Sequence, residues 1–177
     1  MNNKDKIFWI TRSSIFIALL IALQVVTAPL GNIIVTGSIV NLVLIISVMT
    51  CGLAPGLSVA AISPVMAKFV GIGPLWSLVP FISAGNIVLV ILWHYIGNRN
   101  MGHKYAAYVT ALVIAAIAKF LVLYVGILKI AVLILGLPEQ QVAVISIMYP
   151  IMQLITALIG GILATILLPV LKNAIGR

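Results

Sequence analysis

Residues 105–125 read YAAYVTALVIAAIAKFLVLYV, a largely apolar stretch in which Lys119 is the single charged residue. About 20 apolar residues in an α-helix cross the hydrocarbon core of a bilayer, so this stretch predicts a transmembrane helix. The whole chain has a similar composition, because 64% of its 177 residues are hydrophobic and only 7% are charged. An ordinary soluble domain has about 25% charged residues. So few charges cannot cover a soluble surface, and the sequence therefore predicts an integral membrane protein.

Five further apolar stretches are separated by segments that contain glycine, proline or asparagine, which are typical of turns. We expect a tight turn at residues 52–56 and a longer connection at residues 29–37. The sequence thus predicts an all-α membrane protein, a single compact bundle of six transmembrane helices that forms one domain over residues 1–177. The predicted spans are residues 13–29, 38–51, 57–70, 78–95, 105–125 and 142–171.

The positive charges predict the orientation of these spans. Six spans place both termini on one side, which then holds seven of the ten Lys and Arg residues, whereas Lys129 alone lies opposite. Cytoplasmic loops of membrane proteins carry an excess of Lys and Arg, so both termini are predicted to be cytoplasmic (N-in, C-in). The net charge of +8 is then a sign of membrane topology rather than of nucleic-acid binding. The seven cations are Lys4, Lys6, Arg12, Arg99, Lys104, Lys172 and Arg177.

Two lysines, Lys68 and Lys119, fall inside the predicted spans, in the outer part of the membrane. A charge in hydrocarbon is costly and marks a functional site by default. Neither lysine has an acidic neighbour within the spans, because Asp5 and Glu139 are the only acids and both lie outside them. A cation that faces a cavity without an acidic partner suits an anionic substrate such as a carboxylate or a phosphate. The alternative is snorkelling of the ammonium to the headgroups, which we favour for Lys68 but not for the deeper Lys119. Lys119 is therefore the residue that we expect to pair with the negative group of the substrate.

Uncharged polar and aromatic side chains lie in the same outer half of the membrane as the lysines. A few polar groups among apolar walls are typical of a small-molecule pocket, so these residues join the two lysines as candidate substrate-binding residues. The amides also suit hydrogen bonds between helices, and a tryptophan near the interface suits the aromatic belt of a membrane protein. The candidates are Gln24, Asn41, Trp76, Asn86, Tyr124 and Gln153.

The sequence offers no machinery for catalysis. It has no pair of carboxylates for acid–base chemistry and no phosphate-binding Gly-Lys-Ser/Thr loop. Neither His94 nor His103 has a cysteine or an acid at a spacing suited to a metal site. We therefore expect neither an enzyme nor an ATPase, and no metal or other cofactor.

Small residues mark one face of the first span. Ala18 and Ala22 are four residues apart, so they share a helix face and allow another helix to approach closely. Packing within the bundle would use the same pattern, and the pattern alone is weak.

The chain nevertheless resembles a known family, the substrate-binding S components of energy-coupling factor (ECF) transporters. The resemblance covers the basic N-terminus, the Ala-x-x-x-Ala first helix, the six spans and the chain length. The residues that carry it are Thr11-Arg12, Ala18, Ala22, the stretch from Trp9 to Gly37, Asn41, Ser63-Pro64 and Asn86.

The resemblance implies partners and a place for the substrate. It implies that the face of Ala18 and Ala22 docks onto a membrane-embedded T subunit, while two ATPase subunits drive toppling of the S component. It implies that the substrate lies near the outer face, under residues 29–37 and among helices four to six, which carry Asn86, Lys119 and Gln153.

We therefore predict the substrate-capture subunit of an ATP-driven importer in a prokaryotic cell membrane, with a small, anionic vitamin or vitamin-like nutrient as its substrate. Two other classes stay open at this point. One is a small autonomous channel or carrier, which needs no ATPase partner. The other is a membrane scaffold protein without a ligand.

Overall fold

Long helices make up most of the structure, a computed structural model that describes residues 3–73, 75–127 and 149–175. Two short 3-10 helices, η1 (Ala28–Leu30) and η2 (Trp76–Leu78), lie before α2 and α4. Within the described residues all regular structure is helical, which confirms the predicted all-α class. The long helices are α1 (Asn3–Thr27), α2 (Ile33–Cys51), α3 (Leu53–Phe69), α4 (Val79–Gly97), α5 (Lys104–Val125) and α8 (Tyr149–Ile175).

Five of the six long helices are long and apolar enough to cross a membrane, and α3, with 17 residues, is shorter. The helices do not match the predicted spans at every end. α1 begins at Asn3, well before the predicted span at residue 13. Residues 142–148 of the last predicted span lie outside the described residues, as do Lys129 and Glu139.

The connection between α1 and α2 is shorter than the predicted residues 29–37, because α2 already begins at Ile33. Gly31 turns the chain with a left-handed φ of 65°, and the Asn32 side chain then caps the helix. Its Oδ1 accepts hydrogen bonds from the backbone N–H groups of Ile34 and Val35, at 3.0 and 3.3 Å. Gly37 is a packing position within α2, since a Cβ there would lie 2.7 Å from Thr156 Cγ2 of α8.

The predicted turn at residues 52–56 is likewise reduced to Gly52, whose φ of 94° lets α2 end and α3 begin around one residue. Pro55 lies in the first turn of α3, where a helix needs no backbone N–H from it. Gly56 lies within α3 and allows it to approach α2, because a Cβ there would lie 2.6 Å from Val48 Cβ.

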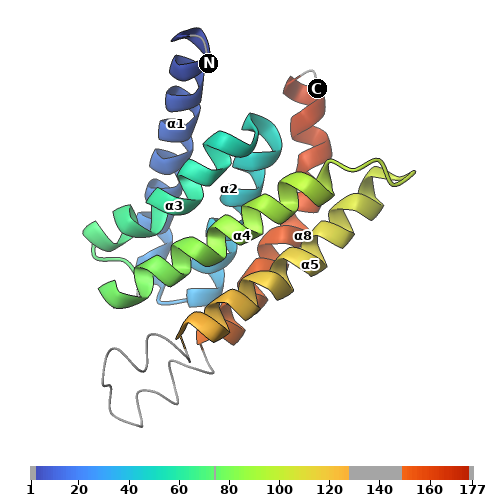
Figure 1. Cartoon of the computed structure of the whole chain (residues 1–177). Helices are drawn as coiled ribbons and strands as arrows, with labels where there is room; N and C mark the ends of the chain where they lie inside the picture. The colour runs from blue at the N-terminus through green and yellow to red at the C-terminus, as the bar shows by residue number, and fades with distance from the viewer. Residues whose placement is uncertain (1–2, 74, 128–148, 176–177) are drawn as a thin grey trace.

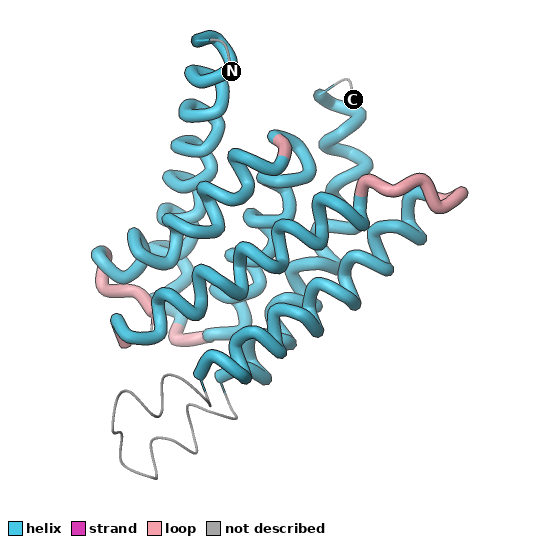
Figure 2. The backbone as a smooth tube through the Cα atoms, in the orientation of Figure 1, coloured by secondary structure: helices cyan, strands magenta, loops and turns pink. Residues whose placement is uncertain are grey.

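Both termini lie at the same end of the bundle, at the top of Figure 1, where α1 extends beyond its neighbours. The loops drawn in Figure 2 show that the α2–α3 and α4–α5 connections face this end, whereas the α1–α2 and α3–α4 connections face the opposite one. We call these the terminal end and the connection end. At the terminal end, Lys172 Nζ of α8 donates a hydrogen bond to Asn98 Oδ1, which follows α4, at 3.4 Å. The cytoplasmic location of the terminal end stays a prediction.

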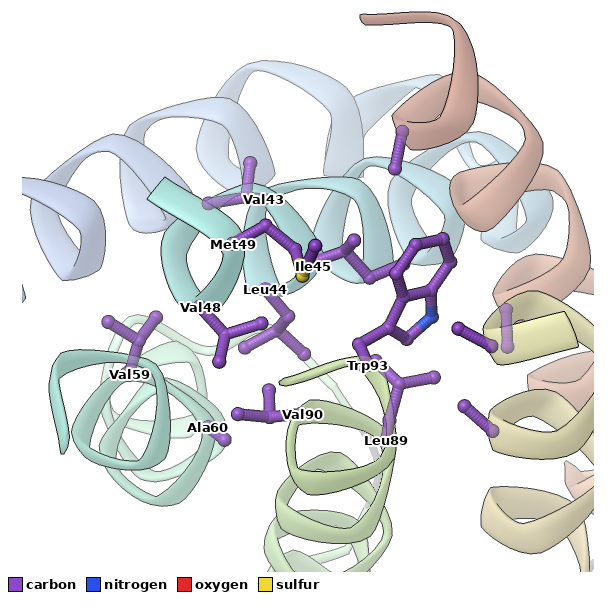
Figure 3. Packing of buried hydrophobic residues seen from close by; sticks show 14 of the residues in the cluster. Val43, Leu44, Ile45, Val48, Met49, Val59, Ala60, Leu89, Val90 and Trp93 are labelled. Carbon is purple, nitrogen blue, oxygen red and sulfur yellow. The ribbon is translucent and has the colours of Figure 1, made fainter. Parts of the chain in front are cut away.

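The apolar core forms where α2 meets its neighbours. Leu44, Ile45 and Val48 of α2 pack with buried residues of α3 and α4, among them Val59 and Trp93 (Figure 3). α2 also packs extensively against α8. The two backbones come close at Gly160 of α8, where a Cβ would lie 2.6 Å from the Ser38 carbonyl oxygen. Close packing at small residues holds helices together in a bilayer, where lipid tails are as apolar as the side chains.

Candidate functional site

A cavity of about 490 Å³ lies at the connection end, among α1, α2, α3, α4 and α8. It forms there because the last turns of α1 and α3 meet the first turns of α2, α4 and α8. The volume lies within the range of about 300–1,000 Å³ that small-molecule pockets occupy. The walls are largely apolar and include Leu20, Val40, Ala67, Val79 and Ile82. The polar side chains of the lining belong to Gln24, Asn32, Thr36, Ser63, Lys68, Asn86, Tyr149 and Gln153.

Four of the eight candidate substrate residues line this cavity, and they come from four different helices. Gln24 comes from α1, Lys68 from α3, Asn86 from α4 and Gln153 from α8. The grouping arises because each residue sits near the end of its helix that meets the cavity. The other four candidates, Lys119, Asn41, Trp76 and Tyr124, are not among the lining residues.

Lys119 lies behind the cavity wall, inside the bundle. It is 1% exposed and continues the buried face of α5 between Ala115 and Leu123. Its Nζ donates to Asn41 Oδ1 at 2.7 Å and to Asn86 Oδ1 at 2.8 Å. The ammonium therefore does not reach the headgroups, and within the described residues its partners are two neutral amides. Whether it also contacts a substrate stays a prediction.

A glycine makes room for this lysine. A Cβ at Gly85 would lie 3.3 Å from Lys119 Cγ and 3.2 Å from Leu123 Cγ. Because Gly85 has no side chain, α4 and α5 can pack closely while the lysine stem passes between them.

A chain of hydrogen bonds continues from Asn41 to α8. Asn41 Nδ2 donates to the Gly37 carbonyl oxygen at 2.9 Å and to Thr156 Oγ1 at 3.2 Å. Thr156 Oγ1 donates to the backbone oxygen of Gln153 at 3.1 Å, and Gln153 Nε2 donates to Tyr149 Oη at 3.2 Å. The amides thus serve both predicted uses, hydrogen bonds between helices and the lining of a pocket. Thr156 was not predicted, although its place three residues after Gln153 puts it on the same helix face.

Two buried polar atoms of the cavity lining have no hydrogen-bond partner among the described residues. They are Gln24 Oε1 and Ser63 Oγ, and both side chains are at least nine-tenths buried. Buried polar groups are rarely left unpaired, so each of these atoms calls for an explanation, and a polar ligand in the cavity would supply one. Ser63 was not a predicted site residue, although the sequence Ser63-Pro64 belongs to the resemblance described above.

Lys68 is half-buried at the cavity and is the one charged residue of its lining within the described part of the chain.

The two aromatic candidates, Trp76 and Tyr124, lie outside the cavity lining. Trp76 is 51% exposed and packs edge-on against Phe69, with ring centroids 5.1 Å apart. Tyr124 is 38% exposed and stacks on Phe120 of its own helix.

Ala18 and Ala22 lie on the exposed face of α1. The opposite face of the same helix is buried and carries Leu20 and Gln24, which line the cavity. The small residues are therefore not used for packing within the described part of the bundle.

The fold and the cavity define a helical membrane protein that can hold a small molecule between its helices. A family model described as "ECF transporter, substrate-specific component" matches residues 12–172, and the chain belongs to this family. This confirms the resemblance seen in the sequence: the chain is a multi-pass membrane protein and a non-catalytic, substrate-specific component of an ECF transporter, a family typical of prokaryotic cell membranes. Neither the curated proteins nor the solved structures gave a match.

Proposed function

We propose that the chain captures a small, anionic, vitamin-like nutrient in the cavity at the connection end and presents it for ATP-driven import. Membership of the family makes it the substrate-specific component, and the lining of the cavity supports the class of substrate. The observation that carries the proposal is the charge of the described lining, in which the half-buried Lys68 meets no acidic residue.

In this proposal each polar group of the cavity has a role. The ammonium of Lys68 attracts the anionic group of the substrate, and a desolvated charge pair of this kind favours both affinity and association rate. Gln24 and Ser63 each have an atom without a partner among the described residues, and these atoms would bond the polar remainder. Asn86 and Gln153 lie in the same lining, and the apolar residues between them hold the carbon skeleton.

The proposal also includes the partners. The exposed face of Ala18 and Ala22 docks onto the T subunit of an ECF module, whose two ATPase subunits supply the energy. The exposure of both alanines supports this role, since a partner helix can reach them without unpacking the bundle.

The experiment is a binding screen on the purified protein in detergent. Compounds released from it by denaturation are identified by mass spectrometry, and a panel of vitamin acids is tested by thermal shift, each acid beside its primary amide. Suitable pairs are nicotinate, pantothenate and biotin with their amides. We expect at least one acid to raise the unfolding temperature more than its amide does. Equal shifts for acid and amide, or stabilisation by neutral compounds alone, would contradict an anionic substrate.

A further inference from the structure

The hydrogen bonds of Lys119 have a consequence for the chemistry of the cavity. We infer that Lys119 is a positioning residue that fixes Asn86 as a hydrogen-bond donor toward the cavity, so that the site selects a ligand with an acceptor oxygen there. The inference deepens the proposed function and rests on it for the presence of a ligand in this cavity.

The two ends of an asparagine amide differ in chemistry, because its oxygen accepts hydrogen bonds and its NH₂ group donates them. The amide can usually rotate by half a turn and exchange the two. A lysine ammonium can only donate, so an amide that contacts it must present its oxygen. Lys119 Nζ contacts the oxygens of Asn41 and Asn86 at 2.7 and 2.8 Å, and it therefore fixes the direction of both amides.

The two amides differ in where their NH₂ groups are used. Asn41 Nδ2 donates to the Gly37 carbonyl oxygen and to Thr156 Oγ1, and Asn41 is not part of the cavity lining. Asn86 does line the cavity, and Lys119 already occupies its oxygen. Its Nδ2 makes no hydrogen bond to the described residues, so the NH₂ group is available to a ligand.

Gln24 is an amide of the same lining whose direction no lysine fixes, and it serves as a comparison for Asn86. Its Oε1 is buried with no partner in the described residues, so no hydrogen bond to that oxygen fixes the direction of its amide. Asn86 lacks that freedom. Together with the ammonium of Lys68, its NH₂ group gives the cavity two groups that can only donate, which match the acceptor oxygens of a carboxylate better than the mixed donor and acceptor of a primary amide.

The test replaces the donor without changing the shape of the side chain. Asn86→Asp keeps an oxygen for Lys119 but presents an acceptor to the cavity. Asn41→Asp is the matched control, because it makes the same substitution beside the same lysine but outside the lining. Lys119→Met removes the group that fixes the amides. The affinities of the acids and amides named above are measured by calorimetry.

We expect Asn86→Asp to weaken binding of the best acid by about tenfold or more and to shift the preference toward its amide. Asn41→Asp should change the affinity for that acid by less than about threefold. Lys119→Met should reduce the preference for acid over amide, since the freed Asn86 amide can turn its oxygen to a donor. Equal losses in the two aspartate variants, or equal losses of acid and amide in Lys119→Met, would overturn the inference.

A measurement without any probe separates this inference from the proposed function. With Lys119 present, Asn86→Asp should leave the unfolding temperature unchanged or raise it, because the new carboxylate gains a charged partner. In the Lys119→Met background the same substitution should lower it by about 5 °C or more, because the carboxylate is then buried without one. Equal effects in the two backgrounds would overturn the inference. If this coupling is present but no acid or amide binds the wild-type protein, the proposed substrate class is wrong, whereas the inference that Lys119 fixes the direction of the Asn86 amide is supported.

Discussion

Replacing Lys68 with methionine should weaken the binding of anionic compounds and leave the binding of their neutral amides almost unchanged. Lys68 is the charged residue of the described cavity lining, and it lies near the end of α3. Methionine keeps much of the length and the apolar stem of lysine, so the substitution removes the charge with little loss of packing.

The size of the effect follows from the position of Lys68. Two unit charges about 4 Å apart attract each other by about 4 kcal/mol at the effective dielectric constant of about 20 near a protein surface. Lys68 is half-buried, so water screens part of this attraction, and desolvation of both groups offsets more of it. We expect about 1–3 kcal/mol to remain, which corresponds to a loss of affinity of about 5- to 150-fold for an acid. For its amide, which has no net charge, the loss should stay below about threefold.

The assay is isothermal titration of the best acid of the panel and of its amide, at low salt and at high salt. Salt should weaken binding of the acid to the wild-type protein more than to the variant, because screening acts on a charge pair that the variant lacks. Lys172→Met, at the terminal end, is the control and should bind as the wild type does. Equal losses for acid and amide in Lys68→Met, or an unchanged affinity for the acid, would refute the assignment of Lys68 to the anion.

Three further outcomes are expected. Ser63→Ala removes a buried hydroxyl that has no partner among the described residues, so the free energy of unfolding without ligand should be unchanged or rise by about 1 kcal/mol, as measured by chemical unfolding. The affinity for the best acid, measured by titration, should fall about three- to tenfold. Gly160→Val should lower the free energy of unfolding by about 2–3 kcal/mol in the same unfolding assay, because even a Cβ there would lie 2.6 Å from a carbonyl oxygen of α2. Ala18→Trp with Ala22→Trp should prevent co-purification with the T and ATPase subunits, whereas Ala106→Trp, on the exposed face of α5, should not.

The helices could be predicted from the sequence because hydropathy alone distinguishes a membrane-spanning stretch from a connection. The connections were harder, and the two glycines that misled the prediction show why. Gly37 and Gly56 resemble turn residues in the sequence, but each lies inside a helix and allows another helix to approach. A glycine that turns the chain and one that makes room for a neighbour are the same letter, and only the packing distinguishes them.

The lining of the cavity was predictable in part of its membership. Polar residues near the same end of several helices must meet if the helices form one bundle, and this grouping holds for Gln24, Asn86 and Gln153. The partners of Lys119 could not be found in this way, because Asn41 and Asn86 lie 78 and 33 residues away along the chain. The outward direction of Tyr124 could have been predicted from the helical period. Lys119 and Leu123 are four residues apart and share the buried face of α5, and Tyr124, one residue after Leu123, points away from that face.

The two proposed activities of the chain meet on α1. Ala18 and Ala22 lie on its exposed face, and Leu20 and Gln24 line the cavity from its opposite face. A rigid helix cannot shift on one face alone, so a partner that displaces α1 would also move part of the cavity wall. The tryptophan variants separate contact from displacement for this reason. Loss of assembly with unchanged affinity for the acid would place the docking contact on the exposed face, whereas loss of both would mean that the bulky side chains had moved α1 itself.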